Sequence, residues 1–225
     1  MINIKKDRNS ILKNIESIHK NSFFKSLPIP KLVAVSKKQE EHRIDEALEC
    51  GQRIFGENRV QEASQRWEER LKHIDDLELR LIGPLQTNKV KQALKLFDII
   101  ETVDREKLAK EIHLHFDNKV KTKSFFIQIN TGSESQKSGI LPLESDSFIQ
   151  YCVNDLKLPV IGLMCIPPYD EESAMHFCLL KKIADRNQLS ELSMGMSKDF
   201  KEGIKFGATS VRIGTKLFGQ RTIVL

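Results

Sequence analysis

This chain of 225 residues contains no long apolar run, although 40% of its residues are hydrophobic. No stretch approaches the roughly 20 apolar residues that a membrane-spanning helix needs. The opening residues 1–8 are polar and charged after the first few positions, and they lack the apolar core of a signal peptide. These absences predict a cytoplasmic protein that makes no use of a membrane.

Cysteines are few and widely spaced, and none forms a C-x-x-C pair. Four thiols arranged in this way are typical of a reduced cytosolic protein, and not of a disulfide framework or a zinc site. His113 and His115 would diverge on a helix because they are only two residues apart, which makes them a poor pair of metal ligands. We therefore expect no metal.

Blocks of like charge are also absent. The 36 basic and 31 acidic residues are interspersed, and the net charge is only +5. Nucleic-acid binding is a weak inference from such a pattern. No exposed heptad and no long apolar edge suggests self-association, so a monomer is the expectation.

What the chain does contain is a regular alternation of short apolar segments and amphipathic helical patterns. An extra helix precedes them, with Ile11, Ile15 and Ile18 on one face. Later helical stripes are Ile44, Ala47 and Leu48, ended by Gly51; Val90, Ala93, Leu94 and Phe97; and Met175, Leu179 and Ile183. The predicted strands are 31–37, 53–57, 79–84, 98–103, 124–130, 159–165, 189–194 and 209–213.

Eight strands, each followed by a helix, predict a single domain over residues 1–225 with the α/β fold of a closed (β/α)₈ TIM barrel. A doubly wound open sheet is the competing architecture, but it normally has a glycine-rich turn after the first strand, which is missing here. In such barrels the site is built at the C-terminal ends of the strands. The polar residues that follow each strand are therefore the candidates.

Lys37 is the first of these candidates, because it ends the apolar run Leu32–Val35. It shares strand parity with Val33 and Val35, so it points into the barrel if they do, while Lys38 has the opposite parity. Partial desolvation lowers the pKa of a lysine, and a partly neutral amine can form a Schiff base with an aldehyde. Taken alone, Lys37 more often marks where a strand meets solvent.

Two turns near the end of the chain form a candidate anion site. Ser197 follows the seventh strand and brings a hydroxyl together with free backbone N–H groups. Gly214 and Thr215 follow the eighth strand, where glycine lets the backbone approach a ligand. Each residue alone fits an ordinary helix cap or tight turn. Both turns facing an inward lysine predict a phosphate-bearing aldehyde.

Arg212 faces inward if Val211 and Ile213 face the helices. A buried guanidinium needs partners, and a structural ion pair with Glu57 or Asp104 is one interpretation. The other is a hydrogen bond from Arg212 to the pyridine nitrogen of a bound ring. Because arginine stays protonated, the ring nitrogen would remain unprotonated, which disfavours carbanion chemistry and suits holding a cofactor.

Eight segments of the chain resemble the pyridoxal phosphate homeostasis proteins, which share the barrel of the alanine racemase N-terminal domain. The segments are LVAVSK (32–37), FGENRVQE (55–62), IGPLQTNK (82–89), TVDREKLA (102–109), QINTGSESQKSG (128–139), GLMCIPP (162–168), LSMGMSKD (192–199) and VRIGTKLFG (211–219). They stand in the right order and span nearly the whole chain from residue 31.

The resemblance implies that pyridoxal 5′-phosphate is bound as a Schiff base on Lys37. It further implies phosphate contacts from Ser197, Gly214 and Thr215, a ring-nitrogen contact from Arg212, and a place in the pocket for Asn58. The family's proline shortly after the lysine is missing, and Arg80 stands where the family commonly has a histidine.

Three functions compete at this point. The first is a non-enzymatic carrier in vitamin B6 homeostasis, whose expected partners are cofactor-dependent apo-enzymes that it contacts transiently. The second is a racemase; in alanine racemase the second base comes from beyond the barrel, and this chain reads only to Leu225, so Tyr169 is the one candidate. The third is an aldolase-like barrel with Glu57 or Asp104 as acid or base beside the lysine.

Overall fold

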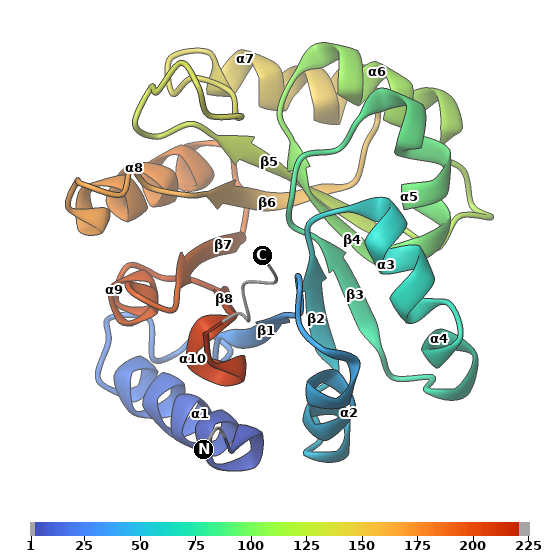
Figure 1. Cartoon of the computed structure of the whole chain (residues 1–225). Helices are drawn as coiled ribbons and strands as arrows, with labels where there is room; N and C mark the ends of the chain where they lie inside the picture. Colours follow the sequence, from blue (N-terminus) through green and yellow to red (C-terminus); the bar gives the residue numbers. More distant parts are fainter. Residues whose placement is uncertain (1–2, 221–225) are drawn as a thin grey trace.

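The computed structural model describes residues 3–220, which form the predicted barrel. Eight parallel strands are hydrogen-bonded in chain order, and the last pairs with the first, so the sheet closes on itself (Figure 1). The strands are β1 (Lys31–Val35), β2 (Ile54–Glu57), β3 (Glu78–Leu81), β4 (Ile99–Val103), β5 (Ser124–Ile129), β6 (Val160–Cys165), β7 (Glu191–Met196) and β8 (Ser210–Ile213).

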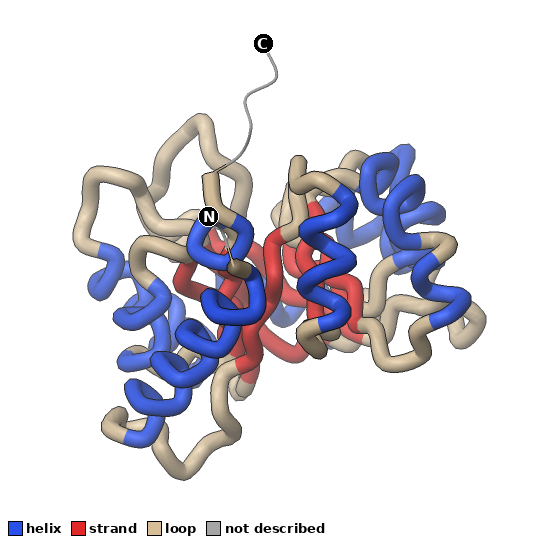
Figure 2. Tube along the Cα trace, turned by 60° about the horizontal axis from the view of Figure 1, so that its bottom comes forward, coloured by secondary structure: helices blue, strands red, loops and turns tan. Residues whose placement is uncertain are grey.

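Helices surround the strands on the outside of the barrel, as the view in Figure 2 also shows. Helix α1 lies against α9, α10 and α2, so it extends the outer layer beyond the eight repeating units. The helices are α1 (Ile4–Lys20), α2 (Glu41–Glu49), α3 (Val60–Trp67), α4 (Arg70–His73), α5 (Val90–Leu96), α6 (Glu106–His115), α7 (Ser145–Gln150), α8 (Ser173–Arg186), α9 (Phe200–Lys205) and α10 (Thr215–Phe218), with short turns η1 (Thr87–Lys89) and η2 (Tyr151–Asp155).

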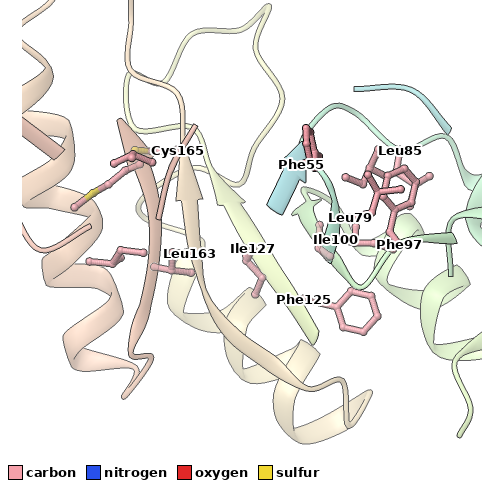
Figure 3. Packing of buried hydrophobic residues seen from close by; sticks show 14 of the residues in the cluster. Phe55, Leu79, Leu85, Phe97, Ile100, Phe125, Ile127, Leu163 and Cys165 are labelled. Atoms are coloured by element: carbon pink, nitrogen blue, oxygen red, sulfur yellow. The ribbon is translucent and has the colours of Figure 1, made fainter. Parts of the chain in front are cut away.

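Strand residues alternate between two environments, as a period of two requires. One set packs against the helices in a large apolar layer; Figure 3 shows part of it, with Phe125 and Ile127 on β5 and Leu163 on β6. The other set points into the barrel, where a small apolar cluster of Ile99, Phe126 and Met164 occupies part of the space. The rest of the interior is lined by buried polar and charged side chains, which bear on the site.

The helical stripes agree with the sequence analysis at most positions. Gly51 follows α2 with φ of +81°, a conformation that glycine adopts without strain. Met175 differs from expectation, because it is 65% exposed near the start of α8. The buried face of α8 passes through Phe177, Leu180 and Ile183, so Ile183 is the one member of the predicted stripe that is fully buried.

Within residues 3–220, no helix combines the length and apolarity that crossing a bilayer would take. The same residues contain no cluster of three or more potential metal ligands. Residues 1–2 and 221–225 of the predicted domain lie outside the described part of the chain.

Candidate functional site

Lys37 lies in the turn immediately after β1, at the C-terminal end of the barrel. Its neighbours alternate as the sequence predicts: Leu32 and Ala34 pack in the outer apolar layer, while Val33 contacts the inward position of Gly56 on β2. Lys37 is half-buried and Lys38 is exposed. Lys37 lines a cavity at the mouth, and Lys38 is not among the residues that line it.

The turns after β7 and β8 contact each other. The Ser197 hydroxyl oxygen accepts a hydrogen bond of 3.4 Å from the backbone N–H of Lys216, in the first turn of α10. Gly195, just before this turn, has φ of +91°, and a Cβ there would lie 2.8 Å from Cα of Phe200. The glycine thus allows the turn after β7 to fold tightly onto the start of α9.

Gly214 brings the turn after β8 close to the end of β1. A Cβ at this position would lie 3.4 Å from Cβ of Val35, two residues before Lys37. Strands β1 and β8 are paired, with Val33 opposite Arg212. Thr215 follows directly and is exposed. Closure of the barrel therefore places the Lys37 turn beside the turn that carries Gly214 and Thr215, and this second turn contacts the one that carries Ser197.

Arg212 points into the barrel and is 3% exposed. Its guanidinium donates to the Ser193 hydroxyl at 2.6 Å and to the backbone carbonyl of Cys165 at 2.8 Å. The nearest carboxylate oxygen belongs to Glu101, at 4.0 Å. A structural ion pair of Arg212 with Glu57 or Asp104, one of the two interpretations of the sequence, is wrong, because Glu57 pairs with Arg66 and Asp104 pairs with Arg105.

Glu101 links Arg212 to a second buried arginine. Its carboxylate accepts from the Ser193 hydroxyl at 2.6 Å and from Arg80 at 3.0 Å. Arg80 also donates to Glu78 at 2.6 Å. Burial alone would lower the pKa of Arg80, but the carboxylates of Glu101 and Glu78 outweigh it and raise the pKa. The residue that stands in place of a histidine is thus a structural cation inside the barrel.

Glu57 lies on the opposite side of the strand layer, where it cannot act as an acid or base at the mouth. Its Oε1 accepts from the Ser36 hydroxyl at 2.7 Å, from Arg66 at 2.9 Å and from the Trp67 indole at 3.0 Å. The side chain is fully buried beneath α3. The hypothesis of an aldolase acid at Glu57 is corrected by this placement.

A cavity of about 730 Å³ opens at the mouth next to Lys37. Asn58 also lines it, so two of the six predicted site residues share this space. Gly83 lies against Asn58, where a Cβ would come within 2.4 Å of the Asn58 carbonyl oxygen. The other lining residues are Arg59, Val60, Gln61, Glu62, Pro84, Leu85, Gln86, Lys89, Asp104, Arg105 and Ser138.

Two groups at this end of the barrel have shifted pKa values. Burial raises the pKa of the Asp104 carboxyl, and the neighbouring Arg105 guanidinium offsets only part of that shift. Burial also raises the pKa of the Cys165 thiol, to about 12. Cys165 is therefore protonated near neutral pH and contributes its carbonyl oxygen, not a thiolate, to the surroundings of Arg212.

Sequence reasoning missed Glu101 and Arg66 as partners of the site. One signal was available: Glu101 is an acid within the apolar segment Ile99–Val103, and a buried carboxylate requires a cation or several donors. Arg66 offered no such signal, because an arginine on an amphipathic helix ordinarily faces solvent.

Comparison with known proteins yields one matching family model, the alanine racemase N-terminal domain, over residues 7–222. Among curated relatives, the pyridoxal phosphate homeostasis protein of Aquifex aeolicus is 41% identical over 201 residues, which cover 85% of this chain and 87% of the relative.

Solved structures show the same relationship. PipY of Synechococcus elongatus, whose structure has pyridoxal phosphate bound, is 30% identical with a TM-score of 0.73, covering 96% of this chain and all of PipY. Alanine racemase from Corynebacterium glutamicum shares the fold at 19% identity and a TM-score of 0.63. The match covers 93% of this chain and 61% of the racemase.

Proposed function

Because this chain belongs to the alanine racemase N-terminal domain family, and within it to the pyridoxal phosphate homeostasis proteins, we propose that it binds pyridoxal 5′-phosphate and holds it without catalysing a reaction. One observation supports this most strongly. The turn that carries Lys37 lies beside the turn that carries Gly214, since β1 pairs with β8 and Gly214 packs on Val35, and the Ser197 hydroxyl contacts the residues that follow Gly214.

The residues at the mouth fit the chemical groups of the cofactor. Lys37 supplies an amine that can form a reversible Schiff base with the aldehyde. Ser197 and Thr215 offer hydroxyl groups, and Gly214 offers a backbone that a phosphate can approach closely. Asn58 belongs to the wall of the same mouth.

Arg212 supports holding rather than catalysis. It is oriented by Ser193 and the Cys165 carbonyl, and as an arginine it remains protonated. A protonated donor facing the ring nitrogen leaves that nitrogen unprotonated. The ring is then a poor sink for electrons, and reactions that pass through a carbanion are disfavoured.

Tyr169, the candidate base of a racemase, lies in the loop after β6 and is 79% exposed. The Lys198 ammonium sits 4.2 Å from the centre of its ring. This arrangement holds the phenol at the protein surface beside the turn after β7. We therefore favour a carrier that buffers the reactive aldehyde in the cytoplasm, as a monomer, and passes it to enzymes that require it.

The first test of the proposal is an absorbance scan of purified protein mixed with pyridoxal 5′-phosphate. A Schiff base gives a band near the visible edge, which a sugar-phosphate aldolase would not. Lys37→Ala should abolish the band, while Lys38→Ala serves as the matched control and should keep it. If the wild type interconverts alanine or serine enantiomers and Tyr169→Phe does not, the carrier proposal is wrong and the protein is a racemase.

A further inference from the structure

The turn that carries Lys37 has an unusual backbone. Lys38, the next residue, has φ of +55°, in the left-handed region that side chains other than glycine rarely adopt. The turn closes with a hydrogen bond of 3.0 Å from the Gln39 N–H to the Ser36 carbonyl oxygen. A turn with such a backbone needs support from its surroundings to keep one conformation.

Arg66 on α3 provides that support from outside the barrel. Its guanidinium donates to the carbonyl oxygen of Ser36 at 2.9 Å and to that of Gln39 at 3.0 Å. These two carbonyls flank Lys37, one residue before it and two residues after it. A single side chain therefore fixes both ends of the turn.

Arg66 is itself held firmly. It donates to the buried Glu57 at 2.9 Å and to Glu41 at 2.9 Å, and only 12% of its side chain is exposed. Burial would lower its pKa, but Glu57 and Glu41 outweigh that effect, so the pKa is raised. Glu57 also accepts a hydrogen bond from the Ser36 hydroxyl, so the same carboxylate binds both the turn and the arginine.

We propose that Arg66 is a positioning residue for the Lys37 amine, holding the turn from residue 36 to 39 so that the amine is presented at the barrel mouth. The inference rests on the proposed function and adds to it a residue that does not touch the cofactor. Its chemical basis is that a fixed amine reaches an aldehyde in the correct orientation more often than one on a loose turn.

The geometry requires arginine and not merely a positive charge. A guanidinium is a rigid, planar fork with five donors, so it can reach two carbonyls and a carboxylate at once, whereas an ammonium on a flexible stem cannot hold all of them in one plane. Arg66→Lys therefore keeps the charge but loses some of these hydrogen bonds, and Arg66→Met loses the charge and all of the hydrogen bonds.

Arg70 is the matched control in the same ion-pair network. It is also largely buried, with 20% of its side chain exposed, and it pairs with Glu41 and Asp45 at 2.8 Å and 2.7 Å. Arg70 also donates to the backbone carbonyl oxygen of Arg66 at 2.7 Å, but none of its described contacts reaches the turn from residue 36 to 39. Arg70→Met removes a comparable side chain without touching the carbonyls beside Lys37.

The experiment compares a covalent and a non-covalent step in wild type, Arg66→Lys, Arg66→Met and Arg70→Met. The covalent step is the rate constant for Schiff-base formation with pyridoxal 5′-phosphate, followed by absorbance. The non-covalent step is the affinity for 4′-deoxypyridoxine 5′-phosphate, in which a methyl group replaces the aldehyde. Thermal unfolding reports the stability of each variant.

We expect Arg66→Met to slow the covalent step by about ten- to a hundredfold, because small displacements of a reacting group carry penalties of that order. Arg66→Lys should show an intermediate loss, and Arg70→Met should match wild type. Affinity for the deoxy analogue should stay unchanged in all four proteins. If Arg66→Met fails to fold, Arg66→Lys decides the matter by the same comparison.

Several results would overturn the inference. An unchanged rate constant in the Arg66 variants, an equal loss in Arg70→Met, or a parallel loss of affinity for the deoxy analogue would each show that Arg66 does not position the amine. A wild-type protein that forms no Schiff base on Lys37 would overturn the proposed function, and the inference with it. A Schiff base on Lys37 whose rate of formation is the same in the Arg66 variants as in wild type would overturn only the inference about Arg66.

Discussion

Two fully buried carboxylates, Glu57 and Glu101, lie on opposite sides of the same strand layer. Each accepts from a serine and from an arginine: Glu57 from Ser36 and Arg66, Glu101 from Ser193 and Arg80. The same combination of residue types thus occurs outside the barrel under α3 and inside the barrel below the mouth.

The two groups differ in what they orient. Glu57 acts on backbone, because Ser36 and Arg66 fix the turn that carries Lys37. Glu101 acts on a side chain, because Ser193 passes its contact on to Arg212. The barrel can therefore orient the two ends of the proposed site separately, one through the helix layer and the other through its interior.

Their electrostatic settings also differ. Glu101 has two guanidinium groups within reach, at 3.0 Å from Arg80 and 4.0 Å from Arg212, and all three side chains are at most 3% exposed. Arg66 has a second carboxylate in Glu41, which is 55% exposed, so it keeps a partner if Glu57 is lost. Removing each carboxylate should therefore have unequal effects.

Glu101→Gln is expected to cause the largest loss. It leaves buried arginines without their shared counter-charge, and breaking a buried pair in this way costs about 3–5 kcal/mol of unfolding free energy. Urea unfolding measures the loss. Glu78→Gln, which removes the other carboxylate that pairs with Arg80, is the control and should lose less, because the Glu78 side chain is 27% exposed. Equal losses would mean that Glu101 holds no special position.

Glu57→Gln should destabilise less, by about 2–3 kcal/mol, because Arg66 keeps Glu41 as a counter-charge and mainly the charge-assisted part of the hydrogen bonds to Glu57 is lost. The same urea titration gives the value. A loss larger than that of Glu101→Gln would contradict this account, since it would mean that Arg66 depends on Glu57 more than Arg80 and Arg212 depend on Glu101.

Ser193→Ala should lose about 1–2 kcal/mol, the cost of leaving buried donors and acceptors unsatisfied. It removes the link between Glu101 and Arg212 while both charges remain. We expect weaker binding of pyridoxal 5′-phosphate with an intact Schiff base on Lys37, measured by equilibrium titration of the absorbance band. Loss of the covalent band itself would show that the two ends of the site are not independent.

The smallest effect concerns pH and Asp104. Burial raises the pKa of Asp104 in the folded protein above its value in the unfolded chain. Between the pKa in the unfolded chain, about 4, and the higher pKa in the folded protein, the folded state keeps a proton that the unfolded state has lost. The free energy of unfolding therefore falls as pH rises through this range. Asp104→Asn should remove this decline, and the stability difference should move in favour of the variant as pH increases.

Asp146 provides a control of opposite sign for the same pH series. Its slight burial is outweighed by hydrogen bonds from Arg186 and Asn187, which lower the pKa of the Asp146 carboxyl. A lowered pKa contributes stability that is lost as pH falls through it. Asp146→Asn should therefore lose stability relative to wild type as pH rises. If the stability difference from wild type changes with pH in the same direction in both variants, the opposite pKa shifts assigned to Asp104 and Asp146 are wrong.

Much of the fold was predictable because it depends on local pattern. All eight strands were found within three residues of their bounds, and Lys37, which strand parity selected over Lys38, lines the cavity at the mouth although β1 itself ends at Val35. The partner of Arg212 was not predictable, because pairing across the barrel interior depends on which layer each inward residue occupies. Glu57 was misplaced for a related reason: it shares strand parity with Phe55, which faces the helices.

The candidate site divides in the same way. Lys37, Ser197, Gly214 and Thr215 follow from strand ends and turn chemistry, which the sequence displays directly. Arg66 does not, since its function arises from the packing of α3 against the turn after β1, and no periodicity encodes which carbonyls a helix side chain will reach.

Borohydride reduction of the protein mixed with pyridoxal 5′-phosphate, followed by peptide mass spectrometry, tests the central claim most directly. Reduction turns a Schiff base into a stable amine and so marks the lysine that carried the aldehyde. The account predicts one modified peptide, with the added mass on Lys37. Modification of Lys38 or Lys89 in place of Lys37, or no modified peptide, would contradict it.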